Sequence, residues 1–170
     1  MSGGIDRDGL LALYAYNAHA NKLVLDTAEK MTVEQFTQKS SPSHDSVRGI
    51  LSHMLECEAY FLAECQGRVL DEEDISSLET ICRRWLALER EQVAFIQSLS
   101  GAELARIVQL QIRGQQLAFP VWELMTQAMI HSVHHRGELS IVMTGLGYPL
   151  PTLDILLHFI KQSGQHWPFE

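Results

Sequence analysis

The sequence predicts an all-α fold: an up-down four-helix bundle with a short β-hairpin insertion before the fourth long helix and a short C-terminal helix. Three observations predict it. Four long stretches repeat apolar residues at alternating spacings of three and four, one short stretch alternates apolar and polar residues, and an apolar segment follows two prolines near the C-terminus. The 170 residues contain no internal repeat, low-complexity tract or linker, so we expect a single domain over residues 1–170.

The first two long helices are predicted from their inner faces. The first face contains two asparagines and comprises Leu10, Tyr14, Asn17, Asn21, Val24, Ala28 and Met31. The second comprises Val47, Ile50, Met54, Cys57 and Phe61. Residues 39–45 form the loop between them, and we expect Ser43 or Asp45 to cap the second helix and Gly67 to end it.

A third helix is predicted over residues 75–99, with the acidic residues 71–74 beside its positive N-terminal end. Its apolar positions are Ile75, Leu78, Cys82, Trp85, Ile96 and Leu99. Between residues 105 and 119 apolar and polar residues alternate, which predicts a β-hairpin that turns near Gly114.

Pro120 suits the first position of the fourth long helix, and Gly145 and Gly147 are expected to close it. Its inner face comprises Val121, Met125, Ala128, Ser132, His135, Leu139, Val142 and Leu146. Beyond Pro149 and Pro151, Thr152 is expected to cap a short final helix packed alongside the bundle. This helix carries Leu153, Leu156, Leu157 and Ile160.

The composition excludes several classes of partner. Asp and Glu total 21 against 13 Lys and Arg, a net charge of −8 without any basic run, which argues against nucleic acid and against an anionic membrane surface. No apolar run approaches the roughly 20 residues of a membrane-spanning helix. The N-terminus lacks the basic and apolar regions of a secretory signal. We therefore expect a cytoplasmic protein.

The three cysteines, an odd number, do not form a disulfide framework. Cys57 and Cys65 would lie about 12 Å apart along one helix, beyond disulfide reach. We interpret the cysteines as reduced thiols that act as small buried apolar residues, with a reactive role as the alternative.

The most informative motif lies on the fourth long helix, which carries His131, His134 and His135. Residues at i and i+4 project from one side of a helix with β-carbons about 6 Å apart, so His131 and His135 can share one metal ion. His134 points about 100° away from His135. His53 lies on the inner side of the second helix and offers a third imidazole. Three imidazoles that converge without a metal would leave ring nitrogens unsatisfied, at about 1–3 kcal/mol each.

A structural interpretation stands beside the metal site: the histidines are hydrogen-bonded core or surface residues of an interaction bundle that holds no metal. The sequence lacks the His-Glu-x-x-His motif of zincins and the paired Glu-x-x-His motifs of di-iron bundles, which lowers support for those two classes. The remaining histidines, His19, His44, His158 and His166, lie in less apolar or terminal settings.

Four segments, in this order, carry a family resemblance: Asn17-Ala-His-Ala-Asn21, Ser46 to His53 followed by Glu58, His131-x-x-x-His135-Arg136-Gly137-Glu138, and Gly147-Tyr-Pro149 with Asp154. With them the chain resembles the DinB-like (YfiT-type) four-helix-bundle proteins. The resemblance implies a divalent metal ion, zinc, nickel or iron, held by three histidines that match His53, His131 and His135, with water in the remaining positions. The chain departs from the family in Glu138, often Gln, and in His19, usually an aromatic residue that would pack behind the site.

Three imidazoles with open coordination positions are typical of a catalytic site, in which the metal activates a water or holds a substrate thiolate. Because family relatives include thiol-dependent transferases, the resemblance implies a metal-dependent thiol (S-)transferase or a hydrolase acting on a small molecule, such as a low-molecular-weight thiol. The alternative is a non-catalytic stress-response bundle that binds a metal or a thiol as a homodimer.

The catalytic residues are not identifiable from the sequence beyond that water or thiolate. Asn17, Asn21 and Glu58 are candidates to orient a ligand imidazole or a water. The alternatives are that the asparagines are buried amides that set the helix register and that Glu58 is an exposed charge. Arg136 is expected to pair with an acidic side chain or a helix end.

Overall fold

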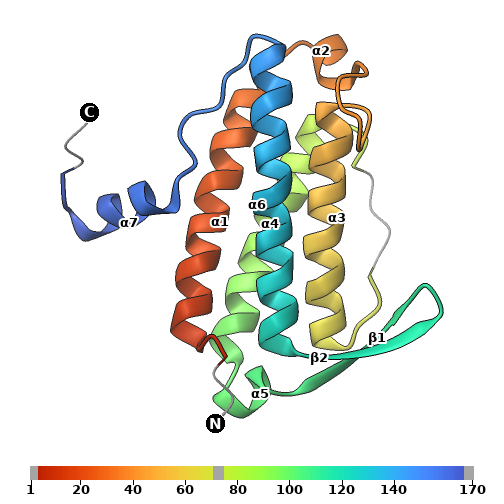
Figure 1. Ribbon diagram of the computed structural model, residues 1–170, viewed down its shortest axis with the longest axis vertical. Coiled ribbons are helices and arrows are strands. Elements are labelled where there is room, and N and C mark those ends of the chain that lie inside the picture. Colours follow the sequence, from red (N-terminus) through yellow and green to blue (C-terminus); the bar gives the residue numbers. More distant parts are fainter. Residues whose placement is uncertain (1–3, 71–74, 167–170) are drawn as a thin grey trace.

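The computed structural model describes residues 4–70 and 75–166, and four long helices lie side by side in it (Figure 1). They are α1 (Arg7–Ala28), α3 (Val47–Gln66), α4 (Leu78–Ser98) and α6 (Val121–Gly145). Helices α1 and α3 each pack against both α4 and α6, so the four form a closed ring around an apolar interior. The predicted helical bundle is confirmed.

Shorter elements connect the long helices. Helix α2 (Val33–Thr37) follows α1, α5 (Gly101–Leu104) follows α4, and α7 (Ile155–Ser163) follows α6. A hairpin of β1 (Ile107–Ile112) and β2 (Gln115–Pro120) leads into α6, as predicted. Helices α2 and α5 were not predicted, because four or five residues are too few to show a helical period.

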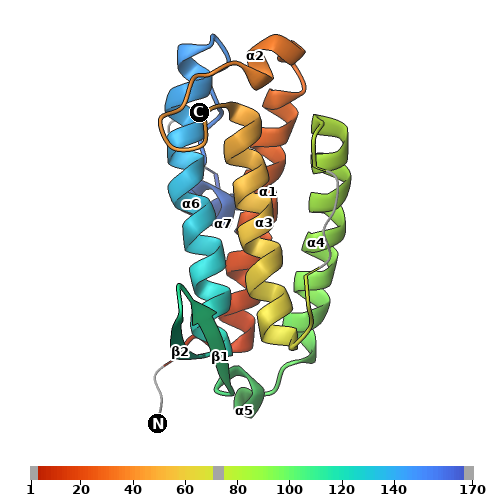
Figure 2. The ribbon, with the colours of Figure 1, turned by 90° about the vertical axis from the view of Figure 1, so that its right-hand side faces the viewer.

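Helices α3 and α4 run in the same direction. Figure 2 shows both beginning at the end of the bundle near α2, and Arg48 in the first turn of α3 donates to the Ser76 carbonyl, 3.5 Å away, just before α4. The spacing of apolar residues along a helix does not tell in which direction that helix runs in the bundle. The connection at residues 67–77 can reach about 36 Å when extended, more than the roughly 30 Å of a helix as long as α3. The long helices therefore run up, down, down and up.

Two of the predicted N-caps are wrong. Ser46 caps α3, not Ser43 or Asp45; its hydroxyl accepts from the Gly49 N–H, and its backbone is extended as an N-cap requires. Asp45 has φ 62°, in the left-handed region, so it cannot occupy that position. Asp154, not Thr152, caps α7.

The other helix ends are close to the predicted ones. Ser77 caps α4, Ile75 precedes it and Leu99 is its C-cap, whereas the acidic residues 71–74 lie outside the described residues. Gly67 ends α3 at φ 68°, as predicted. Pro120 lies one position before the first turn of α6.

The hairpin turns at Arg113 and Gly114, both with positive φ (49° and 78°), which matches the twist of the two strands. Val108 and Leu110 of β1 are buried, so one face of the hairpin covers the end of the bundle.

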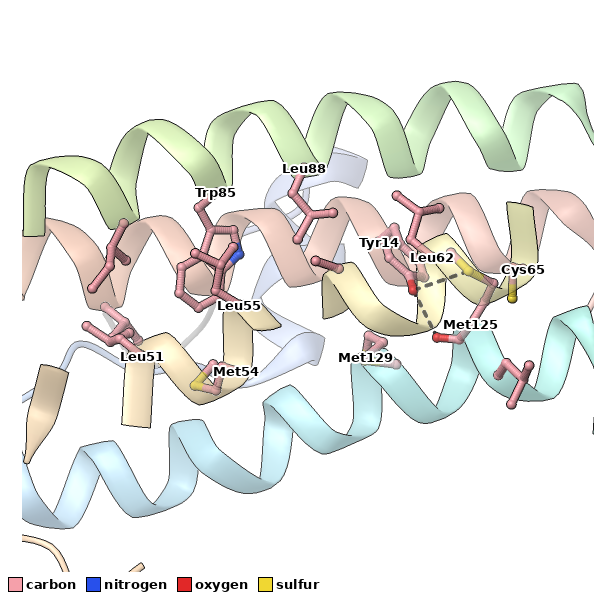
Figure 3. Packing of buried hydrophobic residues seen from close by; sticks show 14 of the residues in the cluster. Tyr14, Leu51, Met54, Leu55, Leu62, Cys65, Trp85, Leu88, Met125 and Met129 are labelled. Carbon is pink, nitrogen blue, oxygen red and sulfur yellow. Dashed lines mark hydrogen bonds between the residues drawn. The ribbon is translucent and has the colours of Figure 1, made fainter. Parts of the chain in front are cut away.

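Large apolar side chains from all four long helices fill the interior. Figure 3 shows Trp85 and Leu88 of α4 packed toward Leu51 and Leu55 of α3. In the same view the Tyr14 hydroxyl donates to the Met125 carbonyl at 2.9 Å and so links α1 to α6. Within the described residues, no helix combines the length and the apolar character needed to cross a membrane.

Candidate metal centre

The structure brings together the three histidines predicted from the sequence, where α3 packs against α6. His53 Nε2 lies 3.2 Å from His131 Nε2, and His131 Nε2 lies 3.2 Å from His135 Nε2. Two nitrogens that bind one ion at about 2.1 Å and lie about 3.2 Å apart subtend an angle of about 100°, between the octahedral and tetrahedral values. The donor set and its spacing therefore fit one divalent metal ion.

A carboxylate fixes the orientation of the His135 ring. Its Nδ1 lies 3.2 Å from Glu138 Oε2, and Glu138 Oε1 accepts from the hydroxyls of Ser41 and Ser43. Burial raises the pKa of Glu138, but these hydrogen bonds from Ser41, Ser43 and His135 outweigh it, and the pKa lies below its ordinary value. Because a carboxylate only accepts, His135 Nδ1 is the N–H donor, and the Nε2 lone pair points toward His131.

All three rings are neutral at pH 7. Burial, followed by the charges of His44, His131 and His135, lowers the pKa of His53 to about 4. Burial also lowers the pKa values of His131 and His135. Metal ions bind the neutral imidazole, so these rings need lose no proton before they bind one at neutral pH.

Two further donors lie beside the three histidines, and sequence reasoning missed both as ligands. His44, in the loop before α3, stacks on His53 with ring centroids 3.9 Å apart and an interplanar angle of 21°. Donor atoms of His44, His53 and His135 all lie within 4.8 Å of one another, and so do those of His53, Cys57 and His131. A loop residue such as His44 shows no periodic signal. Cys57, one turn after His53, could have been found from its i,i+4 spacing.

The loop that carries His44 is held tightly in place. A Cβ at Gly49 would lie 1.9 Å from the His44 carbonyl oxygen, so this position requires glycine. Ser41 Oγ accepts from the backbone N–H of both Ser43 and His44. Since Ser41 and Ser43 also donate to Glu138, the loop and the orientation of His135 are linked.

Cys57 is a half-buried free thiol. Its Sγ lies 3.7 Å from His53 Nε2 and 3.8 Å from His53 Nδ1. Burial, followed by the charges of Glu56 and Glu58, raises the pKa of Cys57 to about 11. Without a cation beside it, the sulfur therefore remains a protonated thiol at pH 7.

Glu58 does not contact the histidines. It is fully buried and accepts hydrogen bonds from three neighbouring helices, from Asn17 Nδ2 at 2.9 Å, Gln92 Nε2 at 2.8 Å and the Ser132 hydroxyl. Five residues separate it from His53, which turns its side chain about 140° around α3. The alternative of an exposed charge is therefore wrong, and its hydrogen bonds give no support to a role in orienting a ligand ring.

Arg136 completes this buried polar network. Its Nη1 donates to Asn17 Oδ1 at 2.7 Å and to Asn21 Oδ1 at 2.6 Å, and its guanidinium lies 5.6 Å from the Tyr16 ring centroid. Within the described residues Arg136 forms no ion pair and no hydrogen bond to a helix end, contrary to prediction. The hydrogen bonds of Asn17 and Asn21 connect helices α1, α3 and α6 and include none to the three histidines.

The two departures from the family pattern differ in their consequences. Glu138 bears directly on the site through its contact with His135. His19 faces α7, where its ring centroid lies 5.1 Å from that of His158, so it does not pack behind the histidine cluster.

Comparison with known proteins agrees with this architecture. The family model described as "DinB family" matches residues 5–165. Protein DinB of Bacillus subtilis (strain 168) is 21% identical over 163 residues, which cover 89% of this chain and 94% of that protein.

Two solved structures share the fold. A DinB-like protein from Bacillus subtilis is 18% identical with a TM-score of 0.66, and the match covers 84% of this chain and 97% of that one. A DinB-like protein from Bacillus cereus ATCC 10987 is 19% identical with a TM-score of 0.68, and covers 89% and 99% respectively. With the family match over most of its length, the chain belongs to the DinB family.

Proposed function

We propose that this protein binds one divalent metal ion, zinc, nickel or iron, through His53, His131 and His135. The observation that carries the proposal is the convergence of three neutral imidazoles with Nε2 atoms 3.2 Å apart in two pairs. His131 Nδ1 is buried and has no hydrogen-bond partner among the described residues. No hydrogen bond at this nitrogen therefore explains why the polar His131 ring is placed here. A metal ion would satisfy the nitrogens that face one another.

As an enzyme, the protein would be a thiol (S-)transferase or a hydrolase, in which the bound ion supplies Lewis-acid activation of a small thiol or of water. The chain's own contribution is to hold the ligand rings. Glu138 keeps the His135 Nε2 lone pair directed at the site, and His44 of the loop before α3 lies edge-on to the His135 ring, with ring centroids 5.2 Å apart.

A groove beside the site offers room for a small-molecule substrate. It has a volume of about 450 Å³ and lies between the loop before α3 and the C-terminal part of α6. Its lining is mostly apolar, with Glu138 as the acidic residue: Ser40, Pro42, Glu138, Ile141, Val142, Gly145 and Leu146. We propose that the groove takes the apolar part of a small thiol substrate.

The second candidate is a bundle that holds the metal without turning over a substrate, and a specific observation favours it. His44 lies within 4.8 Å of donor atoms of His53 and His135, and Cys57 within 4.8 Å of those of His53 and His131. Either side chain, if bound to the ion, would occupy a coordination position that a substrate needs. We propose that this non-catalytic metal-binding protein is a homodimer. Ile130, Val133 and Ile141 on the outer face of α6 are 53%, 41% and 77% exposed, which supports contact with a second copy.

The test is the metal content, by plasma mass spectrometry, of untagged protein purified without chelator. We expect about one equivalent in the wild type and in His134→Ala, the matched control, because His134 is an exposed histidine on the same helix. His131→Ala should contain none. A wild type that remains metal-free after reconstitution, or a His131→Ala variant that retains its metal, would show that the proposal is wrong.

A further inference from the structure

Two facing helices each present a pair of metal-binding side chains one turn apart. Helix α6 presents His131 and His135, and helix α3 presents His53 and Cys57. Both pairs have i,i+4 spacing, which places the members on one side of their helix. The structure therefore brings four donors together, three nitrogens and one sulfur, where the two helices pack.

The sulfur lies close to the three histidines, although not yet at a ligand position. A thiolate bound at about 2.3 Å and an imidazole bound at about 2.1 Å, at the tetrahedral angle, lie about 3.6 Å apart. Cys57 Sγ lies 3.7 Å from His53 Nε2 and 3.8 Å from His53 Nδ1, so the thiol rests against the ring. To bind an ion held at Nε2, the thiol would have to move away from Nδ1 toward His131, whose Nε2 lies 3.2 Å from His53 Nε2. The donor atoms of these three residues all lie within 4.8 Å of one another.

We propose that Cys57 is a fourth protein ligand, so that the loaded site is a closed site of three histidines and one cysteine. This inference rests on the proposed function and deepens it. Four protein ligands fill a tetrahedral shell, whereas three leave a position for a substrate. A thiolate also shifts the preference of the site toward thiophilic ions such as zinc and away from oxygen-preferring ions such as magnesium.

The remaining cysteines serve as internal controls. Cys82 is half-buried like Cys57 but lies on α4, and neither it nor the buried Cys65 belongs to a group of candidate metal ligands among the described residues. A spectroscopic signal from sulfur on the metal can therefore be attributed by single substitutions.

Cobalt(II) is the probe, because a thiolate bound to it gives a sulfur-to-metal charge-transfer band in the near ultraviolet, whereas imidazoles do not. The full chain, freed of metal and kept in thiol-free buffer, is loaded with one equivalent. We expect the band in the wild type and in Cys82→Ser, and its loss in Cys57→Ser and Cys57→Ala. Zinc affinity of Cys57→Ser, measured by chelator competition, should fall at least tenfold, the loss that weaker outer contacts already produce.

The outcomes separate this inference from the proposed function. A wild type that binds one cobalt ion without the band, or a band that persists in Cys57→Ala, overturns the sulfur ligand and leaves the histidine site intact. In that case His44, whose donor atoms lie within 4.8 Å of those of His53 and His135, becomes the candidate for the fourth position. A wild type that binds no cobalt and no zinc overturns both. Far-ultraviolet circular dichroism checks that each variant folds, and the serine variant preserves the size of the side chain.

Discussion

Two polar regions lie inside the same apolar bundle, and their hydrogen bonding differs. Around Glu58, donors meet acceptors: amide and hydroxyl groups from α1, α4 and α6 all point at one carboxylate. Around His131, like groups meet like groups, because neutral imidazole nitrogens face one another at 3.2 Å. The first arrangement is nearly complete in itself: among the described residues, Asn21 Nδ2 and the Nε and Nη2 of Arg136 lack a hydrogen-bond partner. The second would gain a partner for its facing nitrogens from a bound cation, as proposed above.

Substitutions in the two regions should therefore have different effects: those around Glu58 should lower stability, and those around His131 should abolish metal binding. Glu58→Leu leaves three buried donors without their acceptor and removes the negative charge that favours the charged form of Arg136. We expect the free energy of unfolding to fall by about 3–5 kcal/mol. Urea denaturation measures it. Glu58→Gln preserves size and two polar atoms, so its loss should be smaller. If Glu58→Leu were as stable as the wild type, the network would not hold the helices together.

Metal removal should act on the other region alone. Zinc at about 100 times its dissociation constant should stabilise the native state by about 2.7 kcal/mol, visible as a rise in melting temperature that a chelator reverses. His131→Ala should lose this response and His134→Ala should keep it. An equal zinc response in the two variants would contradict the assignment of the site.

Glu138 connects the loop before α3 to His135, a proposed metal ligand, so its substitution should weaken metal binding without unfolding the bundle. We expect Glu138→Ala to lower zinc affinity about 10- to 100-fold, because the His135 ring loses its hydrogen-bond acceptor. Glu138→Gln retains an acceptor oxygen and should lose less. Chelator competition on both variants, with melting temperature of the metal-free forms as control, measures the effect. Unchanged affinity in Glu138→Ala would show that His135 needs no partner.

The metal-free protein should lose stability in acid. The pKa of His53 is lowered to about 4, so between pH 6.5 and pH 4 the unfolded chain binds a proton that the folded chain does not. Stability is therefore complete above about pH 6.5 and falls as the pH drops through this window. Because the ring is only half-buried, the slope should stay below about 1 kcal/mol per pH unit. Urea midpoints of wild type and His53→Asn across this range test it; parallel curves would count against the expectation.

Much of the fold and part of the site follow from the periodicity of the sequence. The spacing of apolar residues predicts the long helices, and the phase of His53, His131 and His135 on those helices brings their rings together. Periodicity cannot predict His44, which lies in a loop, or the choice of Ser46 as N-cap, which depends on a backbone angle at Asp45. It also leaves Glu58 open between a residue that orients a ligand and an exposed charge, because burial of a carboxylate depends on donors supplied by other helices.

The parallel arrangement of α3 and α4 has a consequence for how the chain folds. Neighbouring antiparallel helices can pair through a short turn, but here the proposed ligand His53 of α3 meets His131 of α6, 78 positions away in the sequence. Contacts between distant parts of a chain form slowly and are lost together when it unfolds. The complete set of ligands therefore exists only in the assembled bundle. Metal binding to this protein would therefore indicate that α3, in the N-terminal half of the chain, has packed against α6, in the C-terminal half.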